Sequence, residues 1–225
     1  MLGTPAGQMK DAKIHGYLDF YNGPNLWFCT YWTIYPEPAE GDYATGYEGG
    51  HILSVNVLTG DITDYGVPAK RISWPYHRID TKRGIMYGVG FFGEFLAWDI
   101  KTRSIIWCGY PPKDITWWWR AMMIDEVSGC VYSSYIYDPD PDVHMVKYDP
   151  RTNRFTKMQT RMPHFSGKEQ IIEKDKPLEV DQIRANTLNR GPDGLIWGVT
   201  KQGELFTFDP DTEKLQAKGI NWPGL

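Results

Sequence analysis

A short segment that recurs four times is the feature that most constrains what this chain folds into. Each copy is an apolar or aromatic strand that ends in Asp or Asn, and a Thr follows three residues later. The residues that open the turns are Asn56, Asp99, Asp149 and Asp209. Such a side chain accepts backbone N–H bonds across a turn, and the Thr hydroxyl can satisfy a second turn amide. Each copy therefore predicts a β-hairpin.

A second shared piece lies upstream of each hairpin. It is a Gly followed by an apolar strand with an aromatic residue, and it occurs at residues 84–88, 129–132 and 194–198, and more loosely at 23–27. The turn-opening residues are 43, 50 and 60 positions apart, a period typical of propeller blades with loop insertions. A blade cannot bury both faces alone and must stack on its neighbours. We therefore predict an all-β chain, a β-propeller with four recognisable four-stranded blades, either closed by itself or part of a larger ring.

We expect a single repeat array over residues 1–225. The blades are predicted at residues 13–72, 73–116, 117–165 and 184–225, with the charged stretch 166–183 as a loop between the last two. The second blade is the most regular, with strands expected at His77–Asp80, Gly84–Val89, Phe95–Asp99 and Ser104–Cys108. Two acidic, Pro-containing segments, 36–43 and 138–142, are predicted to be loop insertions.

Charge and apolar patterning argue against two classes of partner. The net charge is −4 and there is no basic tract, so we expect no nucleic-acid partner. No apolar run reaches the length that spans a bilayer, so we expect no membrane partner. The first dozen residues lack the apolar segment of a secretion signal. The chain as it stands is therefore expected in the cytoplasm, and a secreted or periplasmic location requires a leader that precedes it.

Cysteine and histidine spacing argues against a metal site. Cys29, Cys108 and Cys130 fall in predicted strands without a close pair in sequence, so we expect buried thiols and not a disulfide framework. Neither a Cys-x-x-Cys nor a His-x-x-x-His spacing occurs. We expect no metal and no cofactor.

Aromatic residues are abundant, with ten Trp and fourteen Tyr. Two uses remain open, which are packing between blades and flat platforms for sugar rings. The Trp triplet at 117–119 alternates between faces if it forms a strand, so at least one ring faces solvent or a channel. Trp118 is therefore a candidate substrate-binding residue, with blade packing as the alternative.

The first predicted blade carries three motifs in a fixed order. They are Lys-Ile-His-Gly at 13–16, an aromatic-rich strand at 27–32, and Gly-Gly-His-Ile-Leu at 49–53. This order resembles the blade of bacterial β-propeller polysaccharide lyases of the ulvan lyase type and their uncharacterised relatives. The resemblance extends over about residues 13–160.

The resemblance implies that an acidic, uronate-containing polysaccharide is cleaved by β-elimination. That reaction needs a base for the C5 proton, a group that neutralises the C6 carboxylate, and an acid for the leaving O4. His15 and His51 match the family's histidines and are implied to act as acid or base. Arg120, expected in the inner strand of the third blade, is a candidate carboxylate clamp, with stacking on an indole as an equal alternative.

A tyrosine completes the candidate catalytic set. Tyr76, Tyr87 and Tyr110 can each supply a phenol, and no motif chooses between them. We take Tyr87 as catalytic, and Tyr76, Tyr110 and His77 as substrate-binding. His77 is expected to face inward at the start of the second blade, and for each of these histidines a hydrogen-bonded structural role is the alternative.

Two functions from different classes follow. The first is a polysaccharide lyase, and the second is a non-catalytic β-propeller scaffold that binds a glycan or a protein partner. A propeller hydrolase with a channel metal is less favoured, because the chain lacks a set of acidic residues or histidines at strand starts. The expected partners are an acidic polysaccharide or oligosaccharide, and a second copy or another chain that completes the ring.

Overall fold

The computed structural model describes residues 11–14, 16–32, 47–112, 115–117, 121–136, 144–162, 185–200 and 203–221. It divides into two compact units, residues 1–110 and 111–225. Each unit contains two antiparallel sheets, and the described residues form strands and turns without a helix. Each sheet is a β-propeller blade, so the predicted fold class is confirmed.

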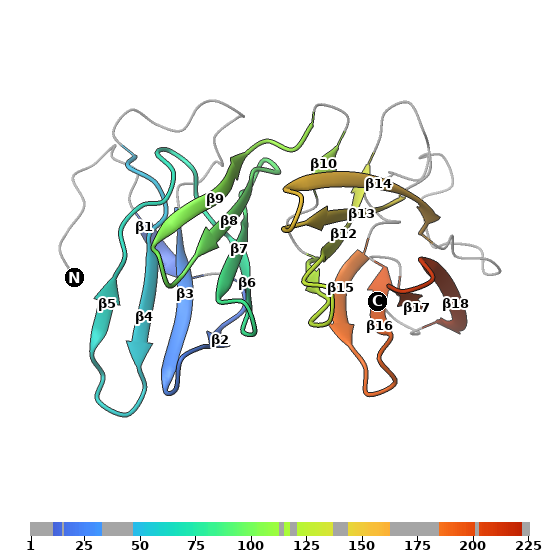
Figure 1. Cartoon of the computed structure of the whole chain (residues 1–225), viewed down its shortest axis with the longest axis horizontal. Coiled ribbons are helices and arrows are strands. Elements are labelled where there is room, and N and C mark those ends of the chain that lie inside the picture. Colours follow the sequence, from blue (N-terminus) through green and yellow to red (C-terminus); the bar gives the residue numbers. More distant parts are fainter. Residues whose placement is uncertain are drawn as a thin grey trace. The chain divides into compact units, whose positions relative to one another are not determined.

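The first unit holds the first and second blades (Figure 1). In the first blade the innermost strand is split into two pieces that both pair with β3. Its strands are β1 (Asp11–Ile14), β2 (Asp19–Phe20), β3 (Asn25–Trp32), β4 (Ile52–Asn56) and β5 (Ile62–Asp64). Those of the second blade are β6 (Tyr76–Asp80), β7 (Ile85–Val89), β8 (Phe95–Asp99) and β9 (Ser104–Gly109). The four strands predicted for the second blade agree with these to within one residue at each end.

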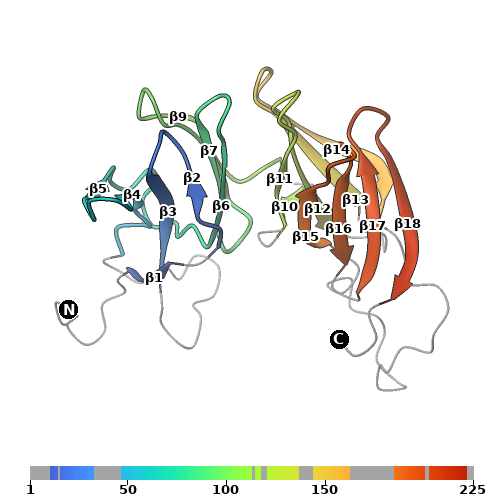
Figure 2. The same ribbon diagram turned by 90° about the horizontal axis from the view of Figure 1, so that it is seen from below.

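The second unit holds the third and fourth blades. The third blade again has a split inner strand, and its strands are β10 (Thr116–Trp117), β11 (Met123–Ile124), β12 (Val131–Ile136), β13 (His144–Asp149) and β14 (Arg154–Arg161). Those of the fourth blade are β15 (Ala185–Arg190), β16 (Ile196–Thr200), β17 (Glu204–Asp209) and β18 (Lys214–Asn221). Figure 2 shows these last four strands side by side in chain order.

The four predicted hairpin turns form as the repeated segment indicates. The Oδ1 atom of each turn-opening side chain accepts the backbone N–H two or three residues later, at 2.7–3.0 Å from Leu58, Thr102, Arg151 and Asp211. The residue after the Thr has a positive φ in every copy, at Gly60, Arg103, Asn153 and Glu213. This shared left-handed residue lets the chain return as a strand, as in hairpins built on a type I turn.

The core of the first unit lies between its two blades. Trp27, Cys29 and Ile52 of the first blade are buried in one cluster with Met86 and Trp98 of the second. The inner strands are also joined, because the Asp19 carboxylate accepts the Ile79 backbone N–H at 2.8 Å. One face of the first blade is therefore packed against the second blade.

The core of the second unit lies between the third and fourth blades. Tyr132 and Met145 are buried together with Leu188, Ile196 and Phe206. All three cysteines are thiols without a disulfide, and Cys29 and Cys130 are buried as predicted, whereas Cys108 is half-buried. Burial and the nearby Glu94 raise the pKa of the Cys108 thiol to about 11.

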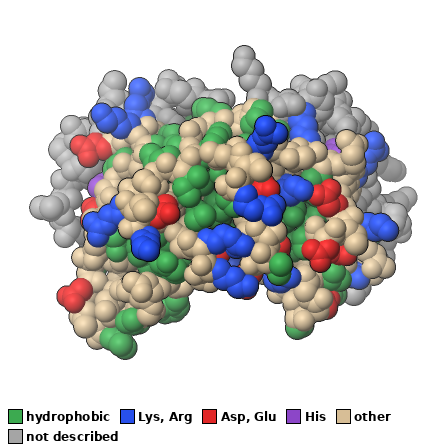
Figure 3. Space-filling model, in the orientation of Figure 1, with side chains coloured by type: hydrophobic (Ala, Val, Ile, Leu, Met, Phe, Trp, Pro, Cys, Tyr) green, Lys and Arg blue, Asp and Glu red, His purple; other side chains and the backbone are tan. Residues whose placement is uncertain are grey.

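Several large apolar side chains of the first unit lie at its surface. Leu18, Phe20, Leu58 and Ile62 are 52%, 56%, 80% and 67% exposed. Figure 3 shows apolar side chains at the surface over this unit, including the tip of the hairpin that joins β4 and β5. The predicted insertions 36–43 and 138–142, and the predicted loop 166–183, lie outside the described residues.

Candidate functional site

Three of the predicted site residues lie outside the described part of the chain. These are His15, Arg120 and Trp118. Their expected roles as base, carboxylate clamp and sugar platform stay predictions. The other five are placed by the structure, and they fall into a buried group and an exposed group.

The buried group lies in the second blade and does not contribute to the candidate site. His77 and Tyr87 have no exposed surface, and Tyr76 is 6% exposed. Burial is the main reason that the pKa of His77 falls to about 4, with an upward contribution from the Trp27 backbone and a downward one from Arg78. The expectation that these side chains contact a substrate does not fit their burial, because β6 and β7, which carry them, are buried along almost their whole length.

Tyr110 and His51 form the exposed group. Tyr110 is 53% exposed, and its hydroxyl donates to Oε1 of the buried Glu94 at 3.1 Å. It lies just after β9, at the end of the second blade. His51 lies just before β4 in the first blade, and the candidate functional site is built around it.

His51 is paired with Asp64, the last residue of β5. The Nδ1 atom of His51 lies 2.9 Å from Oδ2 and 3.0 Å from Oδ1 of Asp64. The side chains are 31% and 50% exposed. Strand pairing brings them together. Asp64 lies opposite Leu53, and Leu53 is two residues after His51, so the three side chains point to the same face of the sheet.

The electrostatics of the pair fix the direction of its hydrogen bond. Partial burial raises the pKa of the Asp64 carboxyl, but the hydrogen bonds from His51 and the Gly66 N–H outweigh it and hold the pKa below its usual value. The Gly66 N–H donates to Oδ1 of Asp64 at 2.7 Å. Asp64 is thus a carboxylate that can only accept, so Nδ1 of His51 donates. In the neutral ring this leaves Nε2 with a lone pair, the arrangement of a histidine that acts as a base.

Two glycines before His51 allow the chain to reach this position. Gly49 has a φ of 128°, and a Cβ there would lie 2.5 Å from the Ala69 carbonyl oxygen. A Cβ on Gly50 would lie 2.6 Å from the Thr30 carbonyl oxygen. The Gly-Gly-His motif therefore combines close backbone packing with the candidate site residue that follows it.

A pocket of about 460 Å³ lies beside this segment. Tyr47 and Glu48, just before the two glycines, and Val67, Lys70 and Arg71, from the connection that follows β5, line it. The Arg71 N–H donates to the Glu48 carbonyl at 2.9 Å, which holds the two segments together. Two cationic side chains and one carboxylate give the pocket an excess of positive charge, which suits an anionic ligand.

Arg71 adopts a backbone conformation that favours glycine. Its φ is 65°, in the left-handed region, which costs roughly 1–2 kcal/mol for a residue with a Cβ. Strained residues of this kind cluster at functional sites. The strain and the charge of the pocket thus coincide at one residue.

The pair and the pocket share one edge of the first unit. β5 ends at Asp64, β4 begins just after His51, and residues 65–75 connect to the start of β6 at Tyr76. These ends of β4 and β5 are the upper ones in Figure 1. Because neighbouring strands are antiparallel, Tyr110 after β9 lies at the corresponding edge of the second blade.

The sequence motif names His51 as a candidate but does not point to its surroundings. Asp64, Tyr47, Lys70 and Arg71 were given no role. For Asp64 a signal existed, because the hairpin opened by Asn56 sets the β4–β5 register and places residue 64 close to residue 51. No pattern in the sequence points to the pocket, which depends on how two irregular segments pack.

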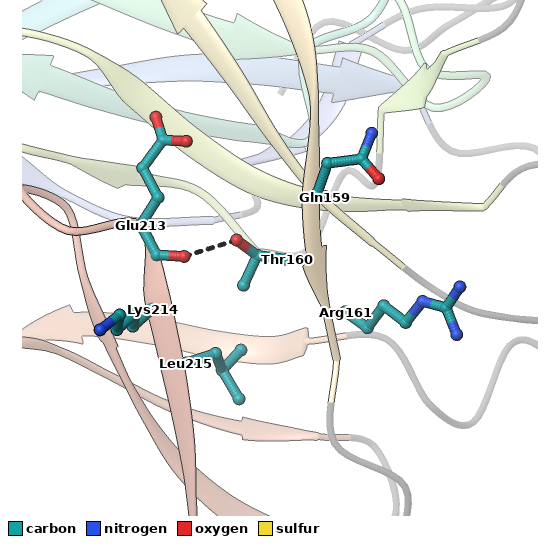
Figure 4. A pocket seen from close by; sticks show the side chains of 6 residues that line it. All are labelled: Gln159, Thr160, Arg161, Glu213, Lys214 and Leu215. Carbon is teal, nitrogen blue, oxygen red and sulfur yellow. Dashed lines mark hydrogen bonds between the residues drawn. The ribbon is translucent and has the colours of Figure 1, made fainter.

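A second pocket, of about 450 Å³, lies in the second unit. It is lined by the end of β14 and the start of β18, where the Thr160 hydroxyl donates to the Glu213 carbonyl at 2.6 Å (Figure 4). The Glu213 carboxylate is already paired with Lys147 at 2.6 Å. Figure 4 shows the Arg161 side chain directed away from Glu213, so the charged groups do not converge on one point. We therefore do not place the functional site here.

The described residues contain neither a metal-binding cluster nor a membrane-spanning helix. No cluster of three or more His, Cys, Asp or Glu side chains that could hold a metal ion occurs among them. Nor does the described part of the chain contain a helix that is long and apolar enough to cross a membrane.

Comparison with known proteins relates the chain to others by fold alone. No protein-family model matches it. No curated protein matches it either. Solved structures do match. The computationally designed Ika8 protein has a TM-score of 0.51 and 13% identity, over 92% of this chain and 49% of the designed chain.

Two further matches are extracellular domains of hybrid two component systems from B. thetaiotaomicron. That of BT4673 has a TM-score of 0.51 and 12% identity, over 91% of this chain and 22% of that chain. That of BT3049 has a TM-score of 0.50 and 15% identity, over 90% of this chain and 21% of that chain. This chain thus spans about half the length of the designed protein and less than a quarter of the two bacterial ones.

Proposed function

We propose that the chain binds an acidic, uronate-containing glycan at the edge of the first blade and cleaves it by β-elimination. The observation that carries the proposal is the His51–Asp64 pair, which is partly exposed and oriented, at the same edge of the first blade as a pocket lined by Lys70 and Arg71. The motif order of the first blade supports the same reaction class.

Each group has a role that follows from its chemistry. Nε2 of His51 takes the C5 proton, while Asp64 holds the ring and stabilises the imidazolium that forms. Lys70 and Arg71 offset the charge that develops on the uronate carboxylate. The C4–O4 bond then breaks, a double bond forms between C4 and C5, and O4 receives a proton from an acid.

Binding without cleavage is the second candidate function. The observation that favours it is the burial of two phenols, because Tyr87 has no exposed surface and Tyr47 in the pocket is only 4% exposed. The exposed phenol of Tyr110 lies in the second blade and donates to Glu94. The same cationic pocket would hold an acidic glycan without the acid that β-elimination needs at O4.

The test is the ultraviolet absorbance of the unsaturated uronate product on a panel of acidic polysaccharides that includes ulvan. We expect His51→Ala to lower the rate by about 100-fold or more, and Asp64→Asn to lower it by at least about 10-fold. Asp61→Asn, in the exposed turn before β5, is the matched control and should keep the wild-type rate. Near-ultraviolet circular dichroism confirms that each variant is folded.

Three outcomes separate the candidates. Product formation that depends on His51 supports the lyase. Absence of product, with affinity electrophoresis showing retardation that Lys70→Ala abolishes, supports the binding scaffold. Product that forms equally with His51→Ala would mean that the site lies elsewhere.

A further inference from the structure

One face of the first blade carries a continuous apolar row. In the register of the sheet, Phe20 lies opposite Leu26, Leu26 opposite Val55, and Val55 opposite Ile62. Residues directly opposite one another point to the same face. Phe20 and Ile62 are 56% and 67% exposed, and Leu26 and Val55 are half-buried. We name these four residues the outer row.

The other face of this blade is already covered. Trp27, Cys29 and Ile52 point to that face and are buried against the second blade. β3 is thus apolar on both faces from Leu26 to Cys29. An antiparallel sheet that meets water on one face usually places polar residues there. The composition of the outer row is therefore that of a surface built to be covered.

The second blade shows what covers such a row. Ile79 lies opposite Met86, and Met86 lies opposite Trp98. Trp98 comes directly before the turn-opening Asp99, just as Val55 comes directly before the turn-opening Asn56. Ile79, Met86 and Trp98 occupy the positions of Phe20, Leu26 and Val55. They are at most 7% exposed, in the core shared with the first blade. Ile79 is 7% exposed where Phe20 is 56% exposed, so the outer row is the surface by which a blade packs on the blade before it.

The fourth blade carries the complementary surface. Val199 lies opposite Leu205, as Cys29 lies opposite Ile52, and Trp197 has the position of Trp27. Trp197, Val199 and Leu205 are each half-buried. In the first blade the corresponding residues pack on the blade that follows. Both halves of one more blade-to-blade contact are thus present in a single chain.

We propose that two copies of this chain form a dimer in which the fourth blade of each copy packs on the outer row of the other. The contact would repeat the packing of the first blade on the second. This contact joins two different surfaces, the fourth blade of one copy and the outer row of the other. In a dimer with a twofold axis the contact therefore occurs two times. Two copies supply eight blades, within the range of ~4–8 for propellers. The designed neighbour, of which this chain covers 49%, is also about twice as long. This proposal does not depend on the lyase activity.

The test is the mass of the full chain in solution, by size-exclusion chromatography with light scattering over a range of concentrations. We expect twice the mass of one chain. Phe20→Asp and Leu205→Asp should each raise the dissociation constant by about 30-fold or more, because each places a charge in the centre of a contact. Leu58→Asp is the matched control. Leu58 is 80% exposed in the β4–β5 turn, and the variant should remain dimeric.

Mixing the two variants tests which surfaces meet. An equimolar mixture of Phe20→Asp and Leu205→Asp contains one undamaged contact per mixed pair, so dimers should reappear. A monomeric wild type, or a mass that keeps growing with concentration, would overturn the proposal. So would a Leu205→Asp variant that dimerises normally while Phe20→Asp does not, because the outer rows would then pack on each other. Circular dichroism on each variant distinguishes dissociation from unfolding.

Discussion

A single buried imidazole makes the stability of the first unit depend on pH. His77 has no exposed surface, and its pKa falls from an ordinary 6.5 to about 4 because burial disfavours the charged ring. In the unfolded chain the same ring takes up a proton once the pH falls below about 6.5. The unfolded state therefore binds more protons between these values, and stability is lost as the pH falls through this window.

We expect this loss to reach about 3 kcal/mol when the pH has fallen to about 4. Urea unfolding at a series of pH values measures it, and His77→Gln should show a correspondingly flatter dependence. At about pH 7 to 8 neither state is charged at this position, so the difference between wild type and variant should be constant there. An equal loss of stability in the variant would show that other groups dominate.

At the scale of the strands and turns, local chemistry explains what was predictable. The Asp or Asn that opens each hairpin bonds its own turn, so the four turns and the strands of the second blade could be predicted from sequence. The split between β1 and β2 could not, because it depends on contacts far away in the chain. At Gly16, between them, a Cβ would lie 2.7 Å from the Pro75 carbonyl oxygen.

The site was predicted in part for the same reason. His51 was found from a motif, and its partner Asp64 follows only once the strands are paired. Tyr87 is predicted as the catalytic phenol, although no motif chooses it over Tyr76 or Tyr110. All five residues of β7 are buried, so Tyr87 belongs to the packing of the blade. A strand that is buried on both faces shows no alternation of polar and apolar residues, so the sequence pattern cannot tell which of its side chains, if any, is exposed.

An ion pair joins the third and fourth blades and should contribute measurably to the stability of the second unit. The Arg190 guanidinium on β15 donates to the Asp125 carboxylate in the turn before β12, and the Asp125 side chain is 3% exposed. Burial raises the pKa of Asp125, but hydrogen bonds from Ser128, Val127 and Arg190 outweigh it and lower the pKa. Removing one partner leaves a charge with poor solvation.

We expect Asp125→Asn to destabilise the second unit by about 2 kcal/mol in urea unfolding. A double-mutant cycle with Arg190→Met should give a coupling of about 1–2 kcal/mol. The control is Arg151→Met, which breaks the surface pair with Asp149 and should cost much less stability than Asp125→Asn, since Arg151 is 65% exposed. A coupling near zero would mean that the pair does not hold the blades together.

At the scale of the whole molecule, two cores predict two unfolding transitions. Met86 and its neighbours form a buried cluster within residues 1–110, and Leu188 belongs to a separate cluster within residues 111–225. Met86→Ala and Leu188→Ala each remove a fully buried side chain, which costs about 2–5 kcal/mol. Because each cluster lies in one unit, each variant should lower one calorimetric transition by roughly 8 °C or more and leave the other in place. If both variants lowered one shared transition equally, the two units would unfold as a single cooperative block. The packing of blades within each unit would then not determine the unfolding temperature of that unit by itself.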